Sequence, residues 1–267
     1  MAHTFSQLQV ERRDNIDIVS LNRPENLNAL NKALFTDLSN YFAGLQEDYT
    51  CRVVILRGEG RAFCAGADLD SSAFAAGEGR EVAQYETQRQ ASSLIRLMRS
   101  CPQVIIALCH GPVCGGGFSL ALAADVRIAA DNTKMNAAYL KVGLSGTDMG
   151  SGYFLPRLIG LSNASLYLLT GRFIKAEQAL NMGLVSDVVP LEALLDTGLN
   201  LANEMLQASP LGLRLTKDAL NALIDAPSLE SAVAIEDRQQ NLLIGTADHR
   251  EAVDAFRTKR SPNYRNC

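Results

Sequence analysis

The chain has 267 residues, 47% of them hydrophobic, so it is long enough to bury a sizeable core and is expected to fold as a globular protein. Its formal net charge is −4, without the clustered Lys and Arg that meet a polyanionic backbone, so nucleic acid is not expected as a partner. No apolar run approaches the ~20 residues that span a bilayer, and residues Met1 to Arg13 lack the basic-then-apolar order of a signal peptide. We therefore expect a soluble protein without membrane insertion, in the cytoplasm or in another reducing compartment such as the mitochondrial matrix.

The first two thirds of the chain repeat one pattern: a short β-branched run, a Gly-rich or polar turn, and then an amphipathic helix. This pattern predicts an α/β fold, arranged as a spiral of ββα units. Helices are indicated by apolar spacings of three and four residues, as at Ala91, Leu94, Ile95 and Met98. The predicted strands are Leu8–Arg12, Ile16–Leu21, Val53–Arg57, Val104–Leu108, Val126–Ala129 and Leu184–Val189.

After about Glu192 the pattern predicts helices alone. They are Leu191–Gln207, Pro210–Leu223, Leu229–Leu243 and Asp248–Arg257. Such a tail either packs back on the core or reaches a neighbouring subunit. We therefore divide the chain into a core of residues 1–195 and a C-terminal helical region of residues 196–267.

The cysteines lie scattered in apolar or small-residue segments, without the paired C-x-x-C spacing of zinc and redox sites. They are Cys51, Cys64, Cys101, Cys109, Cys114 and Cys267. We predict buried free thiols. The three histidines are also dispersed, so no metal site is predicted.

Two turns of small residues follow predicted strands and are candidates for close contact with a ligand. The first contains Ala65, Gly66 and Ala67, which present almost no side chain. The second, Gly115–Gly117, precedes a helical pattern, and helix N-termini carry unpaired N–H groups with partial positive charge. Facing each other, two such turns would form an oxyanion hole, which stabilises negative charge on a carbonyl oxygen. Each turn alone is as well explained by a tight bend in the backbone.

Six segments together, in this order, resemble the crotonase (enoyl-CoA hydratase/isomerase) family. They are Leu21–Leu30, Phe63–Leu69, His110–Gly117, Leu155–Gly160, Ala176–Val185 and Ala255–Pro262. The resemblance covers about residues 8–262. It implies a crotonase-like spiral with a C-terminal all-helical trimerisation region, an acyl-CoA site in the core, and a homotrimer or dimer of trimers. No cofactor beyond the CoA moiety of the substrate is implied.

The resemblance also assigns binding roles to particular residues. It places the donors of the oxyanion hole on the N–H groups of Ala67 and Gly116. Its contacts to CoA fall on Ala65, Asp68, Leu69 and Lys259. Asp68 is alternatively a structural residue of the turn, and Lys259 an ordinary solvated charge. Many relatives carry a cation just after this turn, whereas this chain has Asp70.

The chain departs from the hydratase pattern at the residues that move protons. The typical hydratase uses two glutamates, and their positions fall on Ser119 and Tyr139. Ser119 either holds water or satisfies backbone groups in the first turn of a helix. Tyr139 either donates a hydrogen bond to a carbonyl or is a packed aromatic residue.

One carboxylate lies in a suitable segment. Asp148 sits in the glycine-rich loop Gly143–Gly152, where family members with isomerase or dehalogenase activity often place their aspartate. The loop is one residue longer than usual, and an Asx turn or helix cap is the alternative role. A single carboxylate favours double-bond isomerisation through an enolate. The alternatives are hydration with Ser119 or Tyr139 holding water, a covalent dehalogenase- or thioesterase-like reaction, and an acyl-CoA binding protein without turnover.

Overall fold

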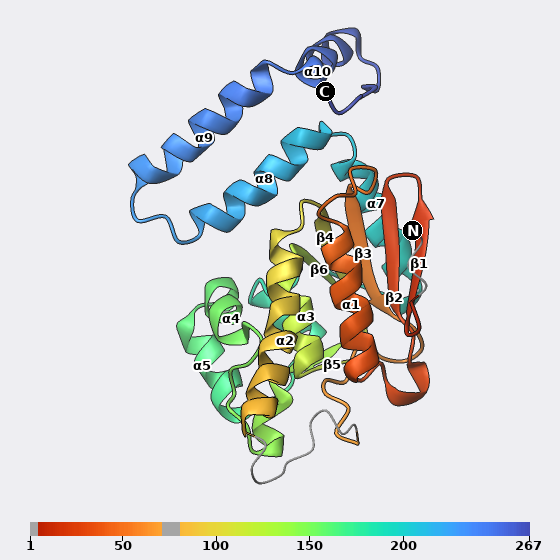
Figure 1. Cartoon of the computed structure of the whole chain (residues 1–267), viewed down its shortest axis with the longest axis vertical. Helices are drawn as coiled ribbons and strands as arrows, with labels where there is room; N and C mark the ends of the chain where they lie inside the picture. Colours follow the sequence, from red (N-terminus) through yellow and green to blue (C-terminus); the bar gives the residue numbers. More distant parts are fainter. Residues whose placement is uncertain (1–4, 71–80) are drawn as a thin grey trace.

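Two β-sheets form the framework of the protein, as seen in a computed structural model that describes residues 5–70 and 81–267 (Figure 1). The larger sheet has the strand order β1-β2-β3-β4-β6-β9, and the smaller has the order β5-β7-β8. All pairs in the larger sheet are parallel except β1 with β2. The larger sheet comprises β1 (Leu8–Arg13), β2 (Ile16–Leu21), β3 (Val53–Gly58), β4 (Val104–Cys109), β6 (Val126–Ala130) and β9 (Asp187–Val189). The smaller comprises β5 (Pro112–Cys114), β7 (Lys134–Asn136) and β8 (Ile174–Lys175).

The chain winds between the two sheets. β4 in the larger sheet leads to β5 in the smaller and then to helix α3, and β6 leads in the same way to β7 and the helical segments behind it. This confirms the predicted α/β spiral of ββα units. The helical segments of this part are η1 (Pro24–Asn26), α1 (Lys32–Gly44), α2 (Glu81–Ser100), α3 (Gly116–Ala123), η3 (Ala138–Val142), α4 (Ser151–Ile159), α5 (Leu161–Thr170) and α6 (Ala176–Asn181).

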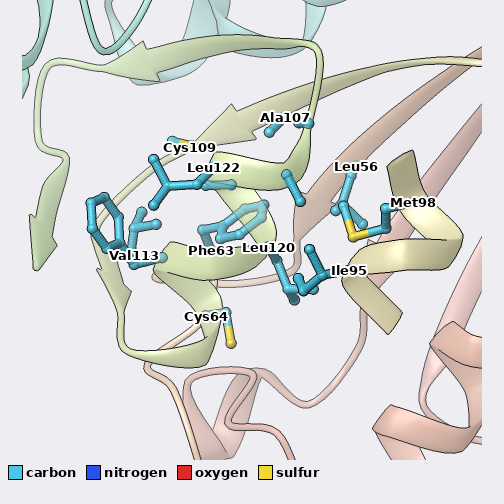
Figure 2. Close-up of a cluster of buried hydrophobic side chains, with 14 of the residues drawn as sticks. Leu56, Phe63, Cys64, Ile95, Met98, Ala107, Cys109, Val113, Leu120 and Leu122 are labelled. Carbon is cyan, nitrogen blue, oxygen red and sulfur yellow. The ribbon is translucent and has the colours of Figure 1, made fainter. Parts of the chain in front are cut away.

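Both faces of the larger sheet are covered, which explains its nearly continuous apolar strands. In β3, Val54 and Leu56 belong to the cluster that includes side chains of α1, α2 and α3. Val53 and Ile55 belong to the cluster on the other face, under α7 (Leu194–Met205), which follows η4 (Leu191–Ala193). Figure 2 shows part of the first cluster, in which side chains of β3, β4, α2 and α3 gather around Phe63.

The C-terminal helices α8 (Pro210–Leu223), α9 (Leu229–Ile244) and α10 (Ala247–Thr258) match the predicted ones to within one residue at each end. Figure 1 shows α9 and α10 standing away from the sheets. α8 is fastened to the core by Lys217, whose buried Nζ lies 2.9 Å from an Asp125 carboxylate oxygen and 2.6 Å from the Gln103 carbonyl oxygen. The division of the chain near residue 195 stays a prediction. Helix α7, which spans this point, begins at Leu194 and packs on the larger sheet.

The predicted strand at Leu184–Val189 is too long, because β9 begins only at Asp187. The Leu184 N–H instead donates to the Ala179 carbonyl at the end of α6, at 2.8 Å, and the Leu184 carbonyl accepts a hydrogen bond from Arg127 Nε. These bonds belong to a helix terminus and not to a ladder. No helix among the described residues is long and apolar enough to cross a membrane. All six cysteines are free; Cys114 is half-buried, Cys267 is exposed, and the others are buried.

Candidate active site

The Ala65–Ala67 turn is held between two other segments of backbone. The Ala65 N–H donates to the Leu27 carbonyl at 3.0 Å, and the Leu30 N–H donates to the Gly66 carbonyl at 2.7 Å. On the other side, the Cys114 N–H at the end of β5 donates to the Cys64 carbonyl at 2.9 Å. The turn that follows β3 is therefore fixed against the turn that follows β5.

Glycine is required where these two turns meet. Gly66 has a φ of +101°, and a Cβ atom there would lie 3.0 Å from the Cys114 carbonyl oxygen. Gly115 has a φ of +49°, and its N–H donates to the Asn136 carbonyl at 3.0 Å. A side chain at either position would strain the backbone, and one at Gly66 would also press on the Cys114 carbonyl. The sequence therefore permits a close contact of backbone with backbone.

Two N–H groups beside this contact are unused. Within residues 5–70 and 81–267, neither Ala67 N–H nor Gly116 N–H donates a hydrogen bond. Gly116 is the first residue of α3, where the helix dipole places partial positive charge. Ala67 is exposed, whereas its neighbour Asp68 uses its N–H to bond the Leu30 carbonyl at 3.0 Å. Ala67 and Gly116 are thus available as the predicted pair of oxyanion donors.

The predicted CoA contacts do not all lie together. Ala65 and Leu69 flank the turn, and Leu69 is exposed. The Asp68 carboxylate is paired with Arg23 at 2.9 Å, which fits its structural role. Lys259 is the C-cap of α10, and Figure 1 shows α10 at the opposite end of the molecule from β5. In a single chain, Lys259 is therefore not brought to the Ala65 turn.

Ser119 and Tyr139 contact each other in the interior behind the turn. Their hydroxyl oxygens are 2.5 Å apart, and both residues are buried. Tyr139 Oη also lies 2.7 Å from the Gly115 carbonyl oxygen, and Ser119 Oγ lies 2.9 Å from the Asp148 carbonyl oxygen. The two hydroxyl protons therefore serve two of these three contacts at a time. Burial raises the pKa of Tyr139, so its hydroxyl stays protonated. The pair links three backbone segments and supplies no carboxylate.

Asp148 lies next to the first turn of α3. Its carbonyl accepts the Ser119 hydroxyl, and Met149 places its sulfur 3.6 Å from where a Gly116 Cβ would be. The Asp148 carboxylate oxygen Oδ1 accepts the Met149 N–H at 2.7 Å. Burial raises the pKa of Asp148, while this hydrogen bond and one from Gln88 lower it, with burial the larger effect. The structure thus brings the backbone of the Asp148 loop against the first turn of α3, while the carboxylate contacts Gln88 and the Met149 N–H.

The alternative role of Asp148 as a cap is also visible. Its N–H donates to the Ser151 hydroxyl at 3.0 Å, and its carbonyl accepts the Ser151 N–H at 2.9 Å. These bonds use backbone atoms, so they leave the carboxylate for other contacts. One such contact, from Gln88, was not predicted. Its only signal in the sequence is a polar residue three positions before buried Ala91, on the apolar stripe of α2.

Comparison with known proteins gives matches over nearly the whole chain. A family model described as "Enoyl-CoA hydratase/isomerase" matches residues 11–266. The Mycobacterium tuberculosis (strain H37Rv) protein named "Probable enoyl-CoA hydratase EchA12" is 38% identical over 266 residues, which cover 98% of this chain and 93% of that protein. The 1,2-epoxyphenylacetyl-CoA isomerase of Escherichia coli K12 is 35% identical over 247 residues, covering 92% and 93%. The crystal structure of an enoyl-CoA hydratase from Bacillus anthracis matches with a TM-score of 0.93 at 32% identity, covering 98% and 100%.

Removing the Tyr139 hydroxyl tests whether the pair stabilises the fold. Tyr139→Phe should lower the free energy of unfolding by about 1–2 kcal/mol, because the buried Gly115 carbonyl and Ser119 hydroxyl lose a partner. Urea denaturation measures the change. The control is Tyr167→Phe, since Tyr167 is also buried but its hydroxyl makes no hydrogen bond to the described residues. Equal stability of the two variants would contradict a structural role for the Tyr139 hydroxyl.

Proposed function

The chain belongs to the enoyl-CoA hydratase/isomerase family, the crotonases, and from this premise we propose that it moves the double bond of an enoyl-CoA thioester. The observation that carries the proposal is the contact set of Asp148, Ser119 and Tyr139. The Asp148 loop lies against the first turn of α3, whereas the two positions of the hydratase glutamates hold hydroxyls in contact with each other and with backbone carbonyls. One carboxylate suffices for isomerisation.

The proposed reaction begins with the thioester carbonyl between the N–H groups of Ala67 and Gly116. The Asp148 carboxylate removes a proton from Cα of a 3-enoyl thioester, which leaves a dienolate. The negative oxygen of the dienolate accepts a hydrogen bond from each of the two N–H groups. Asp148, now protonated, returns the proton at Cγ, and the double bond comes to lie between Cα and Cβ. The carboxylate is regenerated. The positive end of the α3 dipole stabilises the dienolate.

Hydration is the second candidate, favoured by the hydratase names of several relatives. In that reaction Ser119 or Tyr139 would hold the attacking water. Their existing bonds to the Gly115 and Asp148 carbonyls argue against it, because little hydrogen-bonding capacity is left for water. The products separate the two reactions, since only hydration adds oxygen from water to Cβ.

Isomerisation sets few further requirements. Moving a proton between two carbon atoms of one substrate is neither oxidation nor reduction, so no cofactor beyond the CoA moiety is needed. Ala65, Asp68 and Leu69 remain the proposed contacts of that moiety through the turn that carries them. The free thiols fit a reducing compartment such as the cytoplasm.

We also propose that the chain assembles as a trimer or a dimer of trimers. The C-terminal helices expose large apolar side chains that a neighbouring subunit would cover. They include Leu220 (64% exposed), Leu229 (72%), Leu242 (57%) and Ile244 (59%). In such an assembly Lys259, the C-cap of the helix α10 that lies far from β5 in its own chain (Figure 1), would meet CoA at a neighbouring subunit.

The oxyanion hole is tested by Gly116→Pro. Proline fits the first position of a helix but has no N–H, so turnover should fall about 10²–10³-fold. Gly116→Ala is the matched control, because it keeps the N–H while adding a Cβ that meets the tip of the Leu30 side chain. Steady-state kinetics with a 3-enoyl-CoA provide the measurement. If the proline variant is folded and as active as the alanine variant, Gly116 is not a donor.

The proton shuttle is tested by Asp148→Asn. Turnover should fall about 10²–10⁴-fold, with CoA affinity nearly unchanged, since the amide keeps the turn but does not accept a proton. Wild-type activity should be lost as the pH falls through the pKa of Asp148, which burial places above the ordinary aspartate value of ~3.9. The measurement is incubation with a panel of acyl-CoAs in deuterated water, with the label located by mass spectrometry.

Exposed Asp131→Asn serves as the control for the loss of one carboxylate. Full exchange at Cα and Cγ in Asp148→Asn would refute the shuttle. Label at Cα together with a hydroxyl at Cβ would indicate hydration instead. Tight binding of CoA thioesters without any exchange in the wild type would identify a binding protein, and release of CoA or halide a covalent reaction.

The assembly is tested by light scattering of the full chain at micromolar concentration. We expect a trimer or hexamer, because the apolar faces of α8 and α9 otherwise remain in water. Replacing Leu229 and Leu242 together with glutamate should shift the protein towards monomer. A well-behaved monomer of the wild-type chain would contradict the proposed assembly.

A further inference from the structure

The side chain of Gln88 reaches the Asp148 carboxylate from α2. Its Nε2 group donates a hydrogen bond to Oδ1, the oxygen that also accepts the Met149 N–H at 2.7 Å. Oδ2 accepts no hydrogen bond from residues 5–70 or 81–267. Among the described residues, the carboxylate is therefore held through Oδ1 alone.

Gln88 is itself exposed, at the start of the apolar stripe of α2. It precedes the buried residues Ala91 and Ile95 by three and seven positions, so it shares their face of the helix. Ile95 also lies beside the Asp148 loop, since a Cβ on Gly150 would be 3.5 Å from Ile95 Cγ2. Gln88 thus stands where the apolar stripe of α2 leaves the core and meets this loop.

We propose that Gln88 is a positioning residue, which holds Oδ1 of Asp148 so that the unpaired Oδ2 is directed at the acyl chain. The inference rests on the proposed function, because it requires Asp148 to be the proton shuttle. A carboxylate held on one side loses rotational freedom before the substrate binds, and correct placement of a reacting group lowers the barrier. The hydrogen bond also favours the ionised form, against the effect of burial.

The surroundings of the carboxylate contain few other charges. From η3 the titratable group that faces Asp148 is Tyr139, and burial raises its pKa. α3 contributes the Ser119 hydroxyl and α4 the Ser151 hydroxyl, both neutral. On α2, Glu86 and Arg89 pair with each other at 3.7 Å and are largely exposed. Gln88 is therefore the side chain through which α2 acts on the ionisation of Asp148.

Gln88→Leu removes the donor while keeping a side chain of similar size. Asp148 takes up the substrate proton only when it is ionised, and loss of the donor raises its pKa. We therefore expect the acid limb of the kcat profile to move up by about one pH unit and kcat at neutral pH to fall about 10–100-fold, with KM nearly unchanged. Gln90→Leu is the control, since Gln90 is an exposed glutamine two positions further along the same helix.

A second variant keeps the experiment decisive if Gln88→Leu does not fold. Gln88→Glu keeps the shape but places a like charge beside Asp148, so the acid limb should move to still higher pH. Profiles of both Gln88 variants that coincide with the profile of Gln90→Leu would overturn the inference. If Asp148→Asn retains full proton exchange, the proposed function fails. If Asp148→Asn is inactive while the Gln88 variants behave like the control, only the positioning role fails.

Discussion

The candidate site depends on the contact between the backbone of the Gly66 turn and the backbone at the end of β5. No side chain separates the two segments: a Cβ at Gly117 would lie 2.4 Å from the Cys64 carbonyl oxygen, and one at Gly66 would lie 3.0 Å from the Cys114 carbonyl oxygen. The neighbouring N–H groups hold the turns together, whereas those of Ala67 and Gly116 donate to none of the described residues. Donors fixed in this way need no reorganisation when charge develops on a substrate oxygen.

The long apolar strands could be predicted because burial on both faces leaves a continuous β-branched run, as in Val53–Gly58. The strands of the smaller sheet could not be predicted from the sequence. β5, β7 and β8 have only two or three residues each, too few to show any periodicity. They are defined by pairing with one another, and such pairing depends on the fold of the whole chain.

Some residues of the candidate site could likewise be predicted from the sequence, and others could not. The two turns could be proposed because small residues after a strand are visible as a local pattern, and the resemblance to the family then assigned the donors to Ala67 and Gly116. The bond between Ser119 and Tyr139 could not, since it joins residues 20 positions apart through a turn of the spiral. Gln88 and Asp148 are 60 positions apart, and nothing local in either segment indicates the other. The role of the hydroxyls at the two glutamate positions can be assigned only once their backbone partners are known.

The residues of the candidate site are far apart in sequence, and this affects the stage of folding at which the site forms. The bridge between Leu30 and Ala67, the bond from Gly115 to Asn136 and the bond from Ser119 to the Asp148 loop each join segments that are far apart in sequence. Contacts of this kind form late in folding, because ordering the intervening chain costs entropy before they are made. A nascent chain that has emerged only as far as β7 lacks the Asp148 loop altogether. The contacts that bring the two turns and the Asp148 loop together are therefore complete only in the finished fold.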